Sequence, residues 1–154
     1  MSALPGAPFI RKATAADAKR LAAIAHAAYA KYVPRMGREP PPMLADFPAF
    51  IAAGSAVVIE NSGELAGYLI GWPEPDAYLI DNIAIDPARQ GQGLARKLID
   101  HAIAKARRLN LPAVRLYTNV AMTENLIVYG RFGFVETHRA VENGLHRVHM
   151  RLTL

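Results

Sequence analysis

The strongest constraint on the fold is a predicted strand that leads through a glycine-rich turn into a long amphipathic helix. Residues 77–85 are apolar apart from Asp81 and Asn82, which predicts a buried strand, and Gly91 and Gly93 follow in the turn. Apolar residues then recur at helical spacing, with charged residues on the opposite side: Leu94, Ala95, Leu98, Ile99, Ala102, Ile103, Ala106 and Leu109. A strand that runs into such a helix favours a mixed α/β sheet over a helical bundle or a β-sandwich.

Strands are also predicted on both sides of this segment. Short runs of strand character lie at 9–12, 56–60, 65–72 and 114–118, and a hairpin closes the chain. A hydrophobic fraction of 52% in 154 residues is enough to build one buried core. We therefore expect one α/β (α+β) domain that spans residues 1–154.

Capping residues and breakers predict the ends of two further helices. Thr14 with Asp17 resembles a capping box, so a helix is expected to open there and to stop at Pro34. Thr123 is expected to cap a helix near the C-terminal end, and Gly133 stands where a left-handed residue would close it. The proline-rich stretch 35–47 between the early elements predicts a loop that shapes a pocket.

The closing hairpin has a predicted register, because Asn143 and Gly144 suit the two central positions of a tight turn. Counting outward predicts the cross-strand pairs Val141–His146, His138–His149, Thr137–Met150, Glu136–Arg151 and Val135–Leu152. A zinc site at His138 and His149 would need further ligands that the sequence does not place, so an exposed strand face is preferred. We therefore expect no metal.

Composition excludes several classes of protein. The chain has no cysteine, so it has no disulfide, no thiol nucleophile and no cysteine-ligated zinc site. The longest alanine-rich apolar stretch, 21–30, is far shorter than the roughly 20 residues that cross a bilayer. Residues 1–6 lack the features of a secretory signal, so we expect a cytoplasmic protein with no membrane partner. The net charge of +5 leaves anionic ligands and nucleic acids open as partners.

The glycine turn predicts a phosphate site, because the bare amides and the positive end of the helix dipole both attract anions. Gly93 is followed by Leu94 and Ala95, so the lysine and hydroxyl of a mononucleotide phosphate loop are missing. A dinucleotide fingerprint would need a small residue at the position of Arg96. A third pattern, Gln/Arg-x-x-Gly-x-Gly/Ala, is satisfied by Gln90, Gly93 and Ala95. It resembles the pyrophosphate-binding motif of the GNAT family of acetyl-CoA-dependent N-acetyltransferases.

A second segment strengthens this resemblance. The run from Met122 to Phe134 is similar to the helix of the same family that carries a tyrosine and ends in Gly-Phe, here Tyr129 and Gly133-Phe134. The resemblance is close over residues 80–135, and it implies a mostly antiparallel central sheet of about seven strands with about four flanking helices. It also implies acetyl-CoA as a co-substrate. Six basic and two acidic residues between Asp86 and Asn110 give this region a net +4, which suits a phosphate-rich ligand.

By resemblance, acetyl-CoA would contact the chain over two neighbouring stretches. Its pantetheine arm would hydrogen-bond as an extra strand to the main chain of Ile83, Ala84 and Ile85, beside the strand at 114–118. A main-chain N–H there would polarise the thioester carbonyl. Its pyrophosphate would bind the turn and first helical residues: Gln90, Gly91, Gln92, Gly93, Leu94 and Ala95.

The predicted helix from Thr123 carries two further candidates. Asn125 and Tyr129 are four residues apart, which places both on one helical face. In the family a tyrosine at this place protonates the departing thiolate of coenzyme A, so Tyr129 is the candidate general acid and Asn125 a candidate ligand of the cofactor. The alternatives are that Tyr129 packs the helix onto the sheet and that Asn125 helps to cap the helix.

Asp81 is the leading candidate for the base, because an unpaired carboxylate in an apolar strand would be costly. It would deprotonate the acceptor amine or bind its ammonium form. The alternative is a structural aspartate bonded to backbone or to an arginine. Tyr32 and Glu39, from the first helix and the proline-rich loop, are weaker candidates for acceptor binding.

The sequence thus predicts transfer of an acetyl group from acetyl-CoA to a primary amine by direct attack in a ternary complex. The acceptor is expected to be a small molecule or a peptide, its identity stays open, and a homodimer is compatible with the sequence. A non-catalytic acyl-CoA sensor is the main alternative. A basic nucleic-acid-binding protein is disfavoured, since Arg107 and Arg108 have no neighbouring aromatic residue on their helix.

Overall fold

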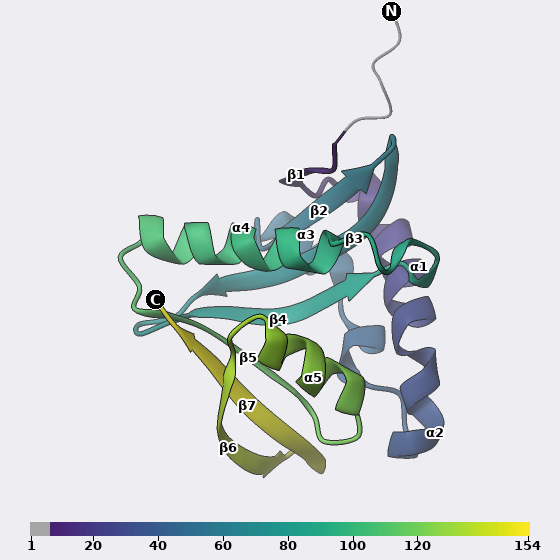
Figure 1. Cartoon of the computed structure of the whole chain (residues 1–154). Helices are drawn as coiled ribbons and strands as arrows, with labels where there is room; N and C mark the ends of the chain where they lie inside the picture. The colour runs from purple at the N-terminus through teal and green to yellow at the C-terminus, as the bar shows by residue number, and fades with distance from the viewer. Residues whose placement is uncertain (1–6) are drawn as a thin grey trace, which may run out of the picture. The chain divides into compact units, whose positions relative to one another are not determined.

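The structure is a computed structural model that describes residues 7–154, and it contains seven strands in one sheet (Figure 1). The strand order is β1-β2-β3-β4-β5-β7-β6. The strands are β1 (Phe9–Lys12), β2 (Ala56–Asn61), β3 (Glu64–Pro73), β4 (Tyr78–Ile85), β5 (Ala113–Asn119), β6 (Val135–Glu142) and β7 (Leu145–Thr153). Residues 1–6, on which the expectation about a secretory signal rests, lie outside the described residues.

The helices lie between β1 and β2, between β4 and β5, and between β5 and β6. They are α1 (Ala18–Tyr29), the one-turn α2 (Val33–Met36), α3 (Phe47–Ala52), α4 (Leu94–Arg108) and α5 (Thr123–Arg131). β4 and β5 pair in parallel, whereas β1–β2, β2–β3, β5–β7 and β6–β7 pair antiparallel. The expected mixed, mostly antiparallel sheet of seven strands is therefore confirmed.

The described residues form two compact units. One contains the chain up to Ile70 and returns for Asn82–Leu98, and the other contains Gly71–Asp81 and Ile99–Leu154. The strands β3 and β4 and the helix α4 are therefore each divided between the two units.

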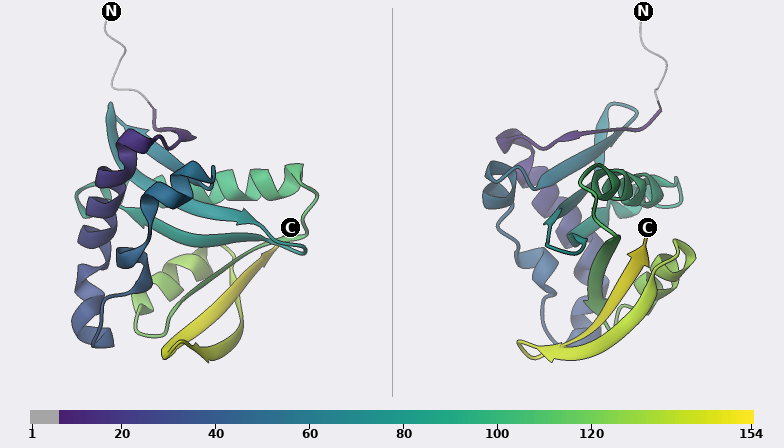
Figure 2. Two further views of the ribbon diagram at one scale, coloured as in Figure 1. Left: turned by 180° about the vertical axis from the view of Figure 1, so that it is seen from behind. Right: turned by 90° about the vertical axis from the view of Figure 1, so that its left-hand side faces the viewer.

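The first unit is built on β1, β2 and β3, with α1 and α3 next to each other (Figure 2). α1 buries Leu21, Ile24 and Ala25, as the helical spacing requires. The ring of Tyr68 on β3 is fully buried, and Phe47 of α3 meets it edge-on with ring centroids 5.4 Å apart.

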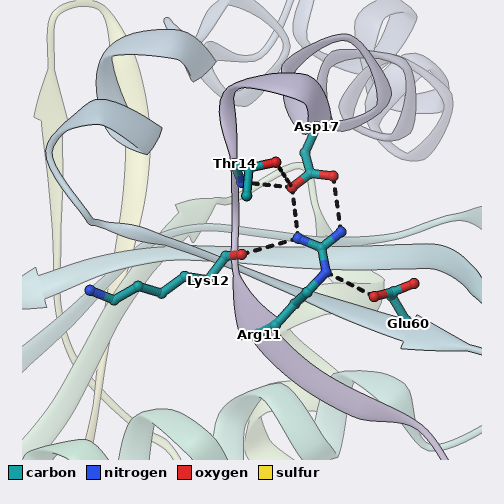
Figure 3. Close-up of polar contacts among 5 residues, drawn as sticks. All are labelled: Arg11, Lys12, Thr14, Asp17 and Glu60. Carbon is teal, nitrogen blue, oxygen red and sulfur yellow. Dashed lines mark hydrogen bonds and ion pairs between the residues drawn. The ribbon is translucent and has the colours of Figure 1, made fainter.

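A polar cluster ties β1, β2 and the start of the first helix together (Figure 3). The guanidinium of Arg11 donates to Glu60 at 2.8 Å and to both carboxylate oxygens of Asp17 at 2.8 and 3.0 Å. Asp17 also accepts from the amide of Thr14 at 2.7 Å, as expected for a capping residue. The helix opens with a 3₁₀ turn, Ala15–Asp17, before α1 begins.

The expectation that Pro34 stops the first helix is wrong. α1 ends at Tyr29, and after a 3₁₀ turn Pro34 lies in the first turn of α2. Proline fits there because the amides of a first helical turn have no partner inside the helix. Gly37, with φ of 72°, follows α2 in the left-handed region.

In the second unit, α5 follows β5, and Gly133 after this helix lies near the side chain of Leu152 on β7. Gly133 has φ of 98°, so the predicted left-handed residue after this helix is confirmed. The predicted cap is wrong by one position, because Met122 is the N-cap and Thr123 is already helical. The hydroxyl of Thr123 instead donates to the side chain of Glu124 at 3.0 Å.

The closing hairpin follows the predicted register only near its turn. Asn143 and Gly144 have φ of 51° and 75°, and the pairs Val141–His146 and His138–His149 are confirmed. An irregularity between Glu136 and His138 then shifts the register by one residue. The three outer predicted pairs, Val135–Leu152, Glu136–Arg151 and Thr137–Met150, are therefore wrong, since Val135 faces Arg151 and Glu136 faces Met150.

No helix within residues 7–154 is both long enough and apolar enough to cross a bilayer. In the same range no group of three or more histidine, aspartate or glutamate side chains is placed to hold a metal ion.

Candidate functional site

The exit of β4 into the glycine turn is fixed by Asp86. Its amide donates to the carbonyl of Ala66 on β3 at 2.8 Å, and its carboxylate accepts from the amide of Ala88 at 3.0 Å. Arg20 of α1 also donates to this carboxylate at 2.5 Å. The Ala88 amide, assisted by Arg20, holds the pKa of Asp86 below its usual value. The turn therefore starts from a defined point in the first unit.

The glycine turn is open to solvent. Gly91 and Gly93 have φ of 81° and 75°, a conformation that favours glycine, and a Cβ built on either one would meet nothing within 4 Å. Residues 90–93 are exposed, whereas Leu94 is buried and begins α4. Within residues 7–154, no side chain therefore fills the space next to the Cβ position of either glycine.

The main-chain amides of Gln90 to Ala95 donate to no residue in the described range 7–154. The first helical bond runs from Lys97 to the carbonyl of Gly93 at 3.3 Å. Bare amides at the start of a long helix, together with the helix dipole, form an anion site. The turn is thus suited to a phosphate group, as the motif predicts.

The turn between β2 and β3 supports the glycine turn from within the same unit. Asn61 donates from its side chain to that of Gln92 at 2.6 Å. Arg89 donates to the carbonyl of Asn61 at 3.3 Å and forms an ion pair with Glu64. Sequence reasoning missed Asn61 and Glu64, because they lie far from the motif and only strand pairing brings them to it.

The end of β4 that precedes this turn is buried. Ile83, Ala84 and Ile85 are less than one tenth exposed, and the carbonyl of Ile83 accepts a hydrogen bond from the hydroxyl of Tyr29 at 2.7 Å. Tyr29 was also missed from the sequence, where only the apolar face of its helix could be predicted.

The proline-rich segment contacts β4 through Asn82. The side-chain oxygen of Asn82 accepts from the hydroxyl of Tyr68 at 2.8 Å, and its nitrogen lies 3.5 Å from the carbonyl of Pro42. The predicted acceptor residues of this region differ in exposure, since Tyr32 is 2% exposed whereas Glu39 is exposed. Lys31 and Arg35 cover the ring of Tyr32, with their charged groups 5.1 and 5.3 Å from its centroid.

In the second unit, Asp81 is half-buried and hydrogen-bonded to a tyrosine. The hydroxyl of Tyr117 on β5 donates to its carboxylate at 2.6 Å. The sequence offered backbone or an arginine as structural partners and missed Tyr117. Ile80 pairs with Leu116 in parallel strands, and this register places Asp81 beside Tyr117. The sequence does not give the register, so it could not predict this contact.

Tyr129 and Asn125 lie on α5 of the second unit. Tyr129 is 9% exposed, and its ring lies 6.1 Å from that of Phe134 at 64°. The side chain of Asn125 is half-buried, with its nitrogen 3.6 Å from the sulfur of Met122. Tyr129 is thus buried beside Phe134, which follows the end of its helix.

Comparison with known proteins identifies the class. Residues 21–134 match the acetyltransferase (GNAT) family, and the chain belongs to this family. Over 60 residues it is 43% identical to the mycothiol acetyltransferase of Geodermatophilus obscurus, a stretch that covers 39% of this chain and 19% of that protein. The chain thus matches about a fifth of the length of this relative.

Solved structures share the fold. The ribosomal-protein-S18-alanine N-acetyltransferase of Escherichia coli has a TM-score of 0.75 and 20% identity, covering 96% of this chain and 94% of that one. The PaiA N-acetyltransferase of Thermoplasma acidophilum, in complex with coenzyme A, has a TM-score of 0.79 and 12% identity, covering 97% of this chain and all of that one.

Proposed function

We propose that this protein transfers the acetyl group of acetyl-CoA to a primary amine by direct attack in a ternary complex. Family membership supports an acetyltransferase, and a protein of the same fold has been solved with coenzyme A. The observation that carries the proposal is the open glycine turn, in which the amides from Gln90 to Ala95 have no acceptor within residues 7–154. These amides bind the pyrophosphate of acetyl-CoA.

The reaction needs one proton removed and one supplied. The acceptor nitrogen attacks the thioester carbon, so that a C–N bond forms and the C–S bond breaks. Asp81 takes the proton that the nitrogen loses, and Tyr129 gives a proton to the departing thiolate. The main chain of Ile83, Ala84 and Ile85 binds the pantetheine arm, and Asn125 contacts the same ligand.

Alanine at Gly93 tests the assignment of the turn. The new Cβ would meet no atom of residues 7–154 within 4 Å, but it would enter the space that the pyrophosphate needs. Isothermal titration with coenzyme A should show at least a tenfold loss of affinity.

Gly54 provides a matched control in the same unit. Its φ of 73° is close to the 75° of Gly93, and its Cβ space is equally open. Gly54→Ala therefore has the same backbone strain and should bind coenzyme A within twofold of the wild type. Normal affinity in Gly93→Ala, or equal losses in both variants, would contradict the phosphate assignment.

The acceptor class is identified by turnover. Release of free thiol from acetyl-CoA is measured with peptides bearing free N-termini, lysine, polyamines and amino acids, each as the sole amine. The amine with the highest kcat/KM defines the acceptor class, and the absence of turnover with any of them would favour the acyl-CoA sensor.

A further inference from the structure

The residues beside Asp81 form a row across four strands of the second unit. Tyr117 on β5 pairs with His149 on β7, and His149 pairs with His138 on β6. Asp81 follows Ile80, which pairs with Leu116, so it continues the row on β4. Residues that pair across strands project to the same face. One face of this unit therefore carries Asp81, Tyr117, His149 and His138 in line.

Contacts along the row hold the ring of Tyr117. The guanidinium carbon of Arg147 lies 4.4 Å from its ring centroid, and the ring of His149 lies 5.6 Å from it. His149 is itself held, because it stacks on His138 at 4.3 Å and its Nε2 lies 2.8 Å from the carboxylate of Glu142. A ring packed in this way has little freedom to turn, so the direction of its hydroxyl is fixed.

The hydroxyl of Tyr117 meets a single oxygen of Asp81. The donor lies 2.6 Å from Oδ1, within the short range of hydrogen bonds to charged oxygens. Among residues 7–154 the carboxylate forms no other hydrogen bond or ion pair. Its second oxygen, Oδ2, is therefore the one left for a ligand.

The polarity of this hydrogen bond is also fixed. Burial and the hydrogen bond to Asp81 raise the pKa of Tyr117 well above that of a free phenol, against smaller opposing effects of Arg147 and Arg115. Tyr117 therefore keeps its proton near neutral pH, and its hydroxyl donates to Oδ1 of Asp81. Asp81 is the hydrogen-bond acceptor of the pair.

We propose that Tyr117 is a positioning residue for the acetyl transfer: it holds Oδ1 of Asp81 so that Oδ2 faces the proton of the acceptor nitrogen. This inference rests on the proposed function, in which Asp81 is the base. Fixing a catalytic group in its productive orientation lowers the entropy lost on reaching the transition state. The hydroxyl of Tyr117 acts through Asp81 alone.

Tyr117→Phe tests the proposal by removing the hydroxyl and keeping the ring. With the best amine from the screen, kcat should fall about tenfold, while the KM for acetyl-CoA stays within twofold. Asp81→Asn should lower kcat about a hundredfold. The double variant should lose no more than Asp81→Asn alone, because Tyr117 has nothing to position once the carboxylate is gone. Losses that multiply in the double variant would overturn the proposal.

Tyr78→Phe is the matched control. Tyr78 is a buried tyrosine of β4 in the same unit, and burial alone raises its pKa, without a carboxylate partner. Its variant should turn over within twofold of the wild type. A fall equal to that of Tyr117→Phe would mean that any lost hydroxyl disturbs this unit, and would overturn the proposal.

Urea unfolding supplies a readout that does not depend on activity. The effects of Tyr117→Phe and Asp81→Asn on the unfolding equilibrium constant should be coupled. The fold-increase of this constant in the double variant should be at least about fivefold smaller than the product of the fold-increases in the two single variants. Tyr78→Phe and Asp81→Asn should multiply independently. Coupling without turnover on any amine would show that the pair exists and that the proposed function fails. Absence of coupling in an active enzyme would refute the positioning role alone.

Discussion

Tyr129 is a packing residue whose hydroxyl is also the candidate acid. Tyr129→Phe keeps the ring against Phe134, so the fold should be retained. Because only the proton donor is lost, kcat should fall about a hundredfold while the affinity for coenzyme A stays within twofold. Thiol release and calorimetric titration measure the two quantities. Unchanged turnover would remove Tyr129 from the mechanism, and a wild type that binds coenzyme A without turnover would be a sensor.

At the scale of single residues, the sequence predicts backbone conformation better than side-chain partners. Gly91 and Gly93 could be assigned because left-handed backbone and a bare turn depend on local residue type. Tyr117 and Asn61 could not, since each reaches its partner across strands that are distant in the chain. Tyr32 was assigned to the acceptor by its position after a helix, but its ring is buried.

Substitution by alanine should have opposite effects on the free energy of unfolding at two glycines, one in β3 and one in α5. A Cβ on Gly67 of β3 would lie 2.6 Å from the side chain of Ile85 and 2.8 Å from the carbonyl of Ala84. Gly67→Ala must therefore push β3 away from the end of β4, and should lower the free energy of unfolding by about 1–3 kcal/mol. Urea unfolding measures the change.

Gly130 in α5 is the counterpart, because a Cβ there meets nothing within 4 Å and the backbone is helical. Gly130→Ala should raise the free energy of unfolding by about 0.5–1 kcal/mol, since alanine loses less conformational entropy in a helix. Destabilisation by Gly130→Ala, or tolerance of Gly67→Ala, would contradict these packing assignments.

At the scale of elements, predicted boundaries were wrong where the local sequence is compatible with two conformations and the rest of the fold selects one of them. Pro34 is compatible both with ending a helix and with starting one, and the structure uses the second. The hairpin register holds from Asn143 as far as His138 and fails beyond it, because the bulge next to Thr137 has no residue signature. Element types were predictable because periodicity is a property of the local sequence.

At the scale of the whole molecule, the Arg11 cluster predicts how stability depends on pH. The hydrogen bond from Arg11, assisted by the Thr14 amide, lowers the pKa of Asp17 from 3.8 to about 2. A carboxyl whose pKa is lower in the folded state than in the unfolded state stabilises the fold at pH values above its unfolded-state pKa. This stabilisation is lost as the pH falls from about 4 to about 2. Asp17→Asn should therefore cost about 1 kcal/mol at pH 7 and progressively less below pH 4.

The exposed ion pair between Arg139 and Glu136 is the control for this measurement. The side chains of Arg139 and Glu136 are 56% and 41% exposed, so Glu136→Gln should leave urea unfolding unchanged both at pH 7 and below pH 4. A cost of Asp17→Asn that is independent of pH would show that the carboxylate charge is not the source of the stabilisation.

The overall arrangement was predictable to the level of the family and not beyond it. Two motifs, at Gln90–Ala95 and at Tyr129–Phe134, were sufficient to imply the sheet of seven strands. The partners of Asp81 were not predictable, because Asp81 lies in a row that forms only when β4, β5, β7 and β6 are in register.

β4 contains two consecutive polar residues that form hydrogen bonds with different partners. Asp81 bonds to Tyr117, and Asn82 bonds to Tyr68. Neighbours on a strand project to opposite faces, so inserting or deleting one residue ahead of them would exchange the acid and the amide. A change in the length of β4 would bury the carboxylate and expose the amide in one step. The length of this strand therefore constrains both hydrogen bonds at once.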